Sequence, residues 1–317
     1  MFRPVDYVLV ALAPLVGCGS SPNNNSPSVD ASTSTMVDSS SIGTDAATGD
    51  YRSSLSTCWS DASCPRVMAV AHGGSWSPTS APYLSNAAIT AAYAAGDEGV
   101  KIDVRFTKDG VPVLAHSSPI ELFESVDCYN KKIEDMTAAQ VTGCHRAPST
   151  TETFQRLDDV LGYLRGKMVA QLCVKRAADF AATITALHAL QAEDFAFIEI
   201  DTADFLAMAP TLPGTAGIHF MVNVASNLTA IDGVLAVASP KAFMIEIDPG
   251  VAIGDLVAAK LHPAGVRAFL YDDAASPTVA QLEAHYEAGF DVVSSQSGPK
   301  GVEARQAINQ ARGVTPP

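Results

Sequence analysis

Basic residues are scarce in this sequence. Its 317 residues include 20 lysines and arginines against 34 aspartates and glutamates, which gives a formal net charge of −14. Nucleic-acid binding needs a basic surface that offsets phosphate charge, so the acidity argues against nucleic acid as a partner. The same charge gives no reason to expect attraction to an anionic membrane, and it does not identify a substrate.

The apolar run near the N-terminus is too short to span a bilayer. Residues 7–17 follow Arg3 and end in Leu-Val-Gly before Cys18, which resembles a bacterial lipobox. We expect a signal peptide at residues 1–17, with lipidation of the Cys18 thiol. An ordinary secretory peptide with an incidental cysteine is the alternative. The lipobox predicts an exported bacterial lipoprotein, anchored to the outer or cell-surface membrane.

Large apolar side chains are nearly missing from the next segment. Residues 18–57 are rich in Ser, Thr, Asn, Asp and Gly. Such a segment buries too little surface to offset the entropy lost on ordering, so we expect a disordered tether. Residues 58–317 are then the folded domain, which we expect to be monomeric.

Apolar runs alternate with helical patterns throughout that domain. With 47% hydrophobic residues, the chain can bury one large core. Eight strand–helix repeats predict a (β/α)8 TIM barrel, whose functional groups lie at the carboxyl ends of the strands. No G-x-G-x-x-G follows any strand, which argues against a doubly wound sheet, the competing fold. The expected strands are 67–72, 100–106, 168–174, 195–200, 218–224, 242–248, 266–271 and 291–295, and the expected helices are 86–95, 154–165, 177–192, 226–238, 252–261, 277–288 and 301–312.

Residues 100–116, VKIDVRFTKDGVPVLAH, predict a β-hairpin that leaves the barrel after its second strand. An Asp-Gly turn between alternating apolar runs is a strong hairpin signal, because both residues tolerate positive φ. Alternation places Lys101 and Asp103 on one face, and the return strand 111–116 brings His116 back towards them. A Lys, an Asp and a His gathered at one end indicate a site, although solvated charges on an edge hairpin would look similar.

The hairpin sequence also carries a family resemblance. A strand ending in His72-Gly73-Gly74, a helix, and then x-x-Asp-Val-Arg-x-Thr-Lys-Asp-Gly-Val-Pro-Val-x-x-His resembles the glycerophosphodiester phosphodiesterase family, of the phospholipase-C-like superfamily. The resemblance covers roughly residues 66–313. It implies hydrolysis of glycerophosphodiesters or related phospholipid head groups, with His72 and His116 as general acid and base.

The resemblance also implies a divalent metal, Mg²⁺ or Ca²⁺, but this sequence departs from the family at that site. Where the family has Glu-x-Asp, this chain has Lys101-Ile102-Asp103, and where it has Glu-x-Lys, the chain has Cys173-Val174-Lys175. The expected Arg after the first His is Gly73, and an expected Glu-Asn pair is replaced by Tyr83-Leu84. Only Asp103 remains of three carboxylate ligands, and hard cations need several oxygen ligands.

Three interpretations follow. In the first, the enzyme works without metal, and the ammonium groups of Lys101 and Lys175 offset phosphate charge beside Asp103. In the second, Glu199 and Glu246 rebuild a metal site around Asp103. In the third, the domain is an inactive surface lipoprotein that binds a phosphorylated ligand. A metal-free enzyme needs Lys101 directed into the cavity, whereas a binding module can pair it with a carboxylate.

The remaining candidates are an aromatic residue and the cysteines. Trp76 follows the His-Gly-Gly turn and could stack on the small-molecule phosphodiester that we expect as the partner. In an exported protein, Cys58–Cys64 and Cys128–Cys144 are plausible disulfides, one before the first strand and one in the long insertion 117–153. Cys173 is left over in a strand, where a lone cysteine usually acts as a small hydrophobe.

Overall fold

The computed structural model describes residues 52–77 and 81–314. The expected signal peptide, the lipobox cysteine Cys18 and residues 18–51 of the expected tether lie outside these ranges. Residues 52–57, which we assigned to the tether, are packed against the domain, and Leu55 is fully buried. Leu55 is the first residue of a helical turn, η1 (Leu55–Trp59), and it packs among apolar side chains of the barrel interior.

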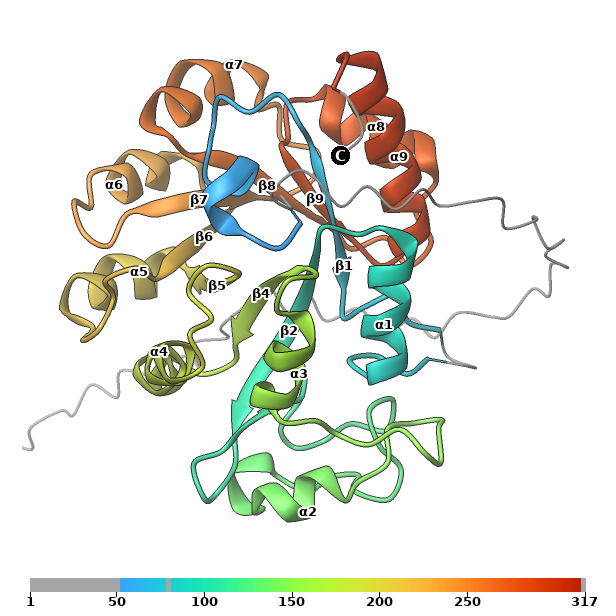
Figure 1. Ribbon diagram of the computed structural model, residues 1–317. Helices are drawn as coiled ribbons and strands as arrows, with labels where there is room; N and C mark the ends of the chain where they lie inside the picture. Colours follow the sequence, from blue (N-terminus) through green and yellow to red (C-terminus); the bar gives the residue numbers. More distant parts are fainter. Residues whose placement is uncertain (1–51, 78–80, 315–317) are drawn as a thin grey trace, which may run out of the picture.

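Eight parallel strands close into a barrel, which confirms the predicted (β/α)8 fold (Figure 1). The sheet order is β1-β9-β8-β7-β6-β5-β4-β2, and a parallel pairing of β1 with β2 closes it. β3 pairs antiparallel with β2, so the predicted hairpin excursion is also confirmed. The strands are β1 (Met68–His72), β2 (Gly99–Phe106), β3 (Pro112–Leu114), β4 (Val169–Val174), β5 (Ala196–Asp201), β6 (His219–Ala225), β7 (Ala242–Ile247), β8 (Arg267–Asp272) and β9 (Val292–Ser295).

Helices surround the barrel, and the main apolar cluster lies between them and the outer faces of the strands (Figure 1). Two α-helices were not predicted, α2 in the insertion and α5. α5 follows β5 without a loop and buries only Phe205, so it shows no apolar stripe of helical period. Within the described ranges, no helix is long and apolar enough to cross a membrane. The α-helices are α1 (Asn86–Ala95), α2 (Ala138–Thr142), α3 (Leu157–Leu164), α4 (Phe180–Ala189), α5 (Thr202–Met208), α6 (Ile231–Leu235), α7 (Gly254–Leu256), α8 (Val279–Glu287) and α9 (Gly298–Ala311).

The inside of the barrel is closed at the amino ends of its strands. Trp59 and Leu55 of η1 pack there in one cluster with side chains of seven strands. The Trp59 ring lies 6.1 Å from the ring of Phe197, and both residues are fully buried. In Figure 1 this blue turn lies over the middle of the barrel. The opposite end, at the carboxyl ends of the strands, is left for the site.

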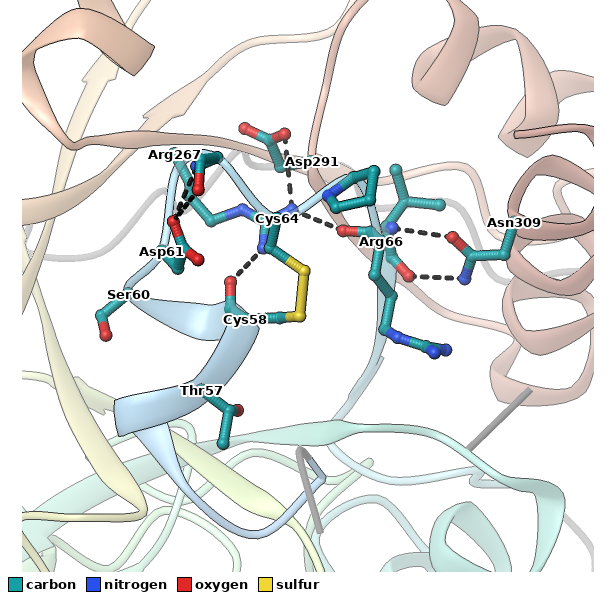
Figure 2. Close-up of a disulfide and its surroundings, with 12 residues drawn as sticks. Thr57, Cys58, Ser60, Asp61, Cys64, Arg66, Arg267, Asp291 and Asn309 are labelled. Atoms are coloured by element: carbon teal, nitrogen blue, oxygen red, sulfur yellow. Dashed lines mark hydrogen bonds and ion pairs between the residues drawn. A yellow bond between two sulfur atoms is a disulfide. The ribbon is translucent and has the colours of Figure 1, made fainter. Parts of the chain in front are cut away.

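The predicted disulfide Cys58–Cys64 holds the entry to β1. Figure 2 shows the guanidinium of Arg267 beside it. This fully buried side chain donates hydrogen bonds to the carbonyl oxygens of Cys58 and Arg66, the latter at 2.6 Å, and lies 3.4 Å from Asp291. A buried guanidinium is tolerated when carbonyl and carboxylate groups satisfy it, so this cluster fastens the N-terminal segment to the barrel.

The insertion 117–153 forms its own small apolar cluster over the hairpin. The predicted disulfide Cys128–Cys144 lies within that cluster. In Figure 1 the insertion, with α2, projects beyond the ring of helices on the side of β2. It is joined to the barrel next to His116, so its folding determines the position of that residue.

Candidate active site

A cavity of about 370 Å³ opens at the carboxyl ends of the barrel strands. This is the end where (β/α)8 enzymes carry their chemistry. The structure brings nearly every candidate residue to its wall: His72, Trp76, Lys101, His116, Lys175, Glu199 and Glu246 all line it, together with Cys173. Asp103 does not line the cavity but lies directly beneath it, fully buried.

Asp103 is held by three donors. The Lys101 ammonium forms a short ion pair with its carboxylate, the Lys175 ammonium lies 2.8 Å from it, and the Tyr83 hydroxyl donates to it at 2.8 Å. Burial alone would raise the pKa of Asp103, but the two ammonium groups lower it well below its usual value. Asp103 is therefore a buried anion that holds Lys101 and Lys175 together at the cavity wall.

These contacts decide how well the chain fits the divalent metal that the family implies. The place beside Asp103 that a cation would occupy is taken by two lysine ammonium groups, which repel a metal ion. Across residues 52–77 and 81–314, no three His, Cys, Asp or Glu side chains are grouped so that they could hold one. Glu199 and Glu246 therefore do not complete a metal site with Asp103. The residues present do not fit a Mg²⁺ or Ca²⁺ site of the family's kind.

Lys101 shows both of the arrangements that were expected to distinguish a metal-free enzyme from a binding module. It lines the cavity, as a metal-free enzyme requires, and it is also paired with a carboxylate. Burial disfavours its charge, but Asp103 raises the pKa of Lys101 above its ordinary value, so it stays an ammonium.

Two departures from the family pattern, at residues 73 and 83, are one structural change. Gly73 has φ +73°, and a Cβ placed on it would lie 1.8 Å from Cε2 of Tyr83. The Tyr83 ring therefore fills the space that the family's arginine side chain would need at residue 73. From there its hydroxyl reaches Asp103. The sequence shows both substitutions, but only the structure shows that they depend on each other.

His72 is the last residue of β1, and its ring is packed between two aromatic side chains. It stacks on Tyr271 with ring centroids 4.3 Å apart and lies 5.8 Å from the ring of Tyr83. Its Nδ1 is buried without a hydrogen-bond partner. Burial, followed by the charge of Lys101, lowers the pKa of His72 well below its usual value. The imidazole is therefore neutral near pH 7.

His116 follows β3, and side chains hold both of its backbone polar groups. Its N–H donates to the Glu124 carboxylate at 2.7 Å, and its carbonyl accepts from Arg105 at 2.9 Å. Its ring lies 6.0 Å from that of Tyr83 and 5.6 Å from that of Phe123. Burial lowers the pKa of His116 to about 4. The Tyr83 ring thus lies close to both histidines.

Aromatic side chains surround the cavity mouth. Trp76 is 37% exposed, and its indole N–H donates to Gln296 at 3.0 Å. Sequence reasoning missed Tyr271, which lines the cavity. The signal was present, since Tyr271 lies at the carboxyl end of β8, two residues after the buried Phe269 and on the same face of the strand.

The comparisons with known proteins agree with this geometry. Residues 78–201 match the model of the glycerophosphoryl diester phosphodiesterase family. Glycerophosphodiester phosphodiesterase 1 of Rattus norvegicus is 35% identical to this chain over 109 residues, which are 34% of this chain and 31% of the rat protein. The chain thus matches about a third of the length of that relative. The predicted resemblance to the family is confirmed.

Solved structures of similar proteins support the same fold. A glycerophosphoryl diester phosphodiesterase from Parabacteroides distasonis superposes with a TM-score of 0.62 at 18% identity, covering 79% of this chain and 90% of that one. A glycerophosphodiester phosphodiesterase from Agrobacterium tumefaciens superposes with a TM-score of 0.59 at 18% identity, covering 75% of this chain and 99% of that chain. An Oleispira antarctica phosphodiesterase in complex with the product sn-glycerol-3-phosphate superposes with a TM-score of 0.56 at 17% identity, covering 76% of this chain and 96% of that chain.

Proposed function

We propose that this protein is a phosphoric diester hydrolase that acts on glycerophosphodiesters or related phospholipid head groups without a metal ion. The observation that carries the proposal is Asp103 holding two lysine ammonium groups at the wall of a cavity that also contains both histidines. Lys101 and Lys175 would offset the charge of the phosphoryl oxygens, which is the work that a metal does in the family.

His72 and His116 would move the protons. Both are neutral in the free protein, so either histidine can accept the proton that the attacking nucleophile loses. The other histidine must donate a proton to the leaving alkoxide. The negative charge of the bound diester favours a protonated imidazole beside it, so this histidine takes up a proton from solvent when the substrate binds. Trp76 at the mouth would contact the part of the substrate that remains outside.

The alternative is an inactive surface lipoprotein that binds a phosphorylated ligand. The observation that favours it is the ion pair of Lys101 with Asp103, because an ammonium already paired with a carboxylate offsets less of the charge that grows on the phosphoryl oxygens during turnover. Binding would then survive without turnover.

Hydrolysis of a glycerophosphodiester panel by the full chain tests both. Turnover that persists in EDTA and is lost in His72→Ala and His116→Ala is the expected result. His188→Ala, on α4 outside the cavity, is the matched control. Activity that depends on added Mg²⁺, Ca²⁺ or Zn²⁺ would contradict the metal-free mechanism. Binding of glycerol 3-phosphate without turnover of any diester would favour the binding protein.

We further propose that the protein is an exported lipoprotein anchored through Cys18. The support is the sequence that precedes Cys18, Leu-Val-Gly. Expression of the full chain in a bacterium, followed by membrane fractionation, should place it with the membranes. Cys18→Ser should move it to the soluble fraction, whereas equal partitioning of the two would contradict lipidation.

A further inference from the structure

Two carboxyl groups on the cavity wall have no part in the proposed proton transfers. Glu199 lies on β5 and Glu246 on β7, and they are only 5% and 8% exposed. β6 runs between these two strands and pairs with both. Buried carboxyl groups are costly unless something compensates them, so their place on a cavity wall needs a reason.

The wall around them offers hydrogen-bond acceptors that no protein group satisfies. The Gln171 side-chain amide donates to Glu199 at 2.9 Å, which leaves the Gln171 carbonyl oxygen without a partner. One carboxyl oxygen of Glu246 is buried and also has no partner. An unsatisfied buried polar group costs about 1–3 kcal/mol, so this wall is suited to a ligand that brings donors.

The charges of the cavity come from different strands, the two ammonium groups from β2 and the end of β4 and the two carboxyl groups from β5 and β7. Lys101 and Lys175 with Asp103 carry one net positive charge, which balances a singly charged phosphodiester. Burial, and then the charge of Glu199, raise the pKa of Glu246 well above its usual value. A cation between these carboxyl groups would relieve their repulsion. The cavity therefore complements a ligand with an anionic phosphate at one end and a cation at the other.

We propose that Glu199, Glu246 and Gln171 form a subsite for a primary ammonium group, so that the preferred substrate is a phosphodiester of a primary amino alcohol such as ethanolamine. A primary ammonium has three N–H donors, which match the three acceptor side chains. A trimethylammonium group has none, so it leaves the acceptors unsatisfied. The assignment rests on the proposed function only in placing the phosphate at Lys101 and Lys175.

Binding tests the subsite independently of turnover. Isothermal titration of the full chain with O-phosphoethanolamine and with phosphocholine gives two dissociation constants under the same conditions. We expect O-phosphoethanolamine to bind at least tenfold more tightly. Glu199→Gln and Glu246→Gln, which keep side-chain size, should each bring the ratio of the two constants to within threefold. Unchanged melting temperatures would show that both variants fold.

Two further variants separate contact from long-range charge. Glu287→Gln removes an exposed carboxylate of α8 outside the cavity and should leave the ratio unchanged. Asp248→Asn removes an exposed one at the cavity edge and should change it less than threefold. If Asp248→Asn lowered the ratio of the two dissociation constants as much as Glu199→Gln and Glu246→Gln do, selectivity would come from the overall negative charge around the cavity, and the subsite would be overturned.

The remaining outcomes are equally decisive. Equal affinity for the two ligands in the natural protein, no binding of either, or a ratio that Glu199→Gln and Glu246→Gln leave intact would overturn the subsite. Hydrolysis of glycerophosphoethanolamine and glycerophosphocholine, measured in parallel, distinguishes the two proposals. Selective binding without turnover would contradict the proposed hydrolase and support the ammonium subsite. Turnover without selectivity would support the hydrolase and contradict the subsite.

Discussion

Tyr83 fills the space beside Gly73, so closely that a Cβ on Gly73 would lie 1.8 Å from its ring. The same tyrosine donates to Asp103 and lies beside the rings of His72 and His116. Glycine at residue 73 is therefore what allows an aromatic hydroxyl into the centre of the site, where it adds a third donor to the carboxylate that two lysines share.

The first prediction concerns this pair. Gly73→Ala should destabilise the fold by about 2–4 kcal/mol, because the methyl group collides with Tyr83 at a positive φ. In Tyr83→Ala that collision is absent, so the double variant should be at least about 1 kcal/mol more stable than the sum of the two single changes predicts. Urea unfolding measures all four proteins, and additive effects would contradict the coupling.

Asp103→Asn should cost about 3–5 kcal/mol of stability at pH 7, because it leaves two buried ammonium groups without their anion. Since the pKa of Asp103 is lowered in the fold, its contribution is complete above the unfolded value near 3.9 and is lost as the pH falls further. The stability difference between the two proteins should therefore shrink below about pH 4. Asp158→Asn, which breaks an exposed pair with Arg156, should cost at most about 1 kcal/mol at pH 7.

The pH dependence of turnover should reflect buried histidines. Because burial lowers the pKa of His116 to about 4 and that of His72 well below its usual value, both remain neutral in the free enzyme down to about pH 5. Turnover needs one neutral and one protonated imidazole, so kcat/KM, which reports the free enzyme, should rise as the pH falls from 7 to 5 and decline only below about pH 4. A maximum of kcat/KM near pH 6.5 would indicate solvated imidazoles instead. Melting temperatures at each pH exclude unfolding as the cause.

The two disulfides should differ in their effect on function. Cys128→Ser with Cys144→Ser opens a loop of sequence separation 16 and should cost about 3 kcal/mol. It should also lower turnover, because Glu124 of that insertion holds the backbone of His116. Cys58→Ser with Cys64→Ser, at the closed end of the barrel, should cost about 2 kcal/mol and change kcat/KM little. Equal loss of turnover in both would contradict the role of the insertion.

The strands could be predicted because each is a buried apolar run between clear breaks, and every barrel strand begins and ends within one residue of its expected range. The pairing of Lys101 with Asp103 followed from alternation on one strand. Tyr83 could not be found in this way, because its position depends on the space that Gly73 leaves at the start of the same connection between β1 and α1. Trp59 was likewise missed, since its burial needs the whole barrel interior to be assembled.

Trp59 and Leu55 close the barrel at the amino ends of its strands. The cavity at the other end opens beside Trp76, so a ligand would enter and leave there. For the proposed hydrolase, the phosphate and one of its two attached groups would enter through this mouth, while the group on the other side of the phosphate would stay outside.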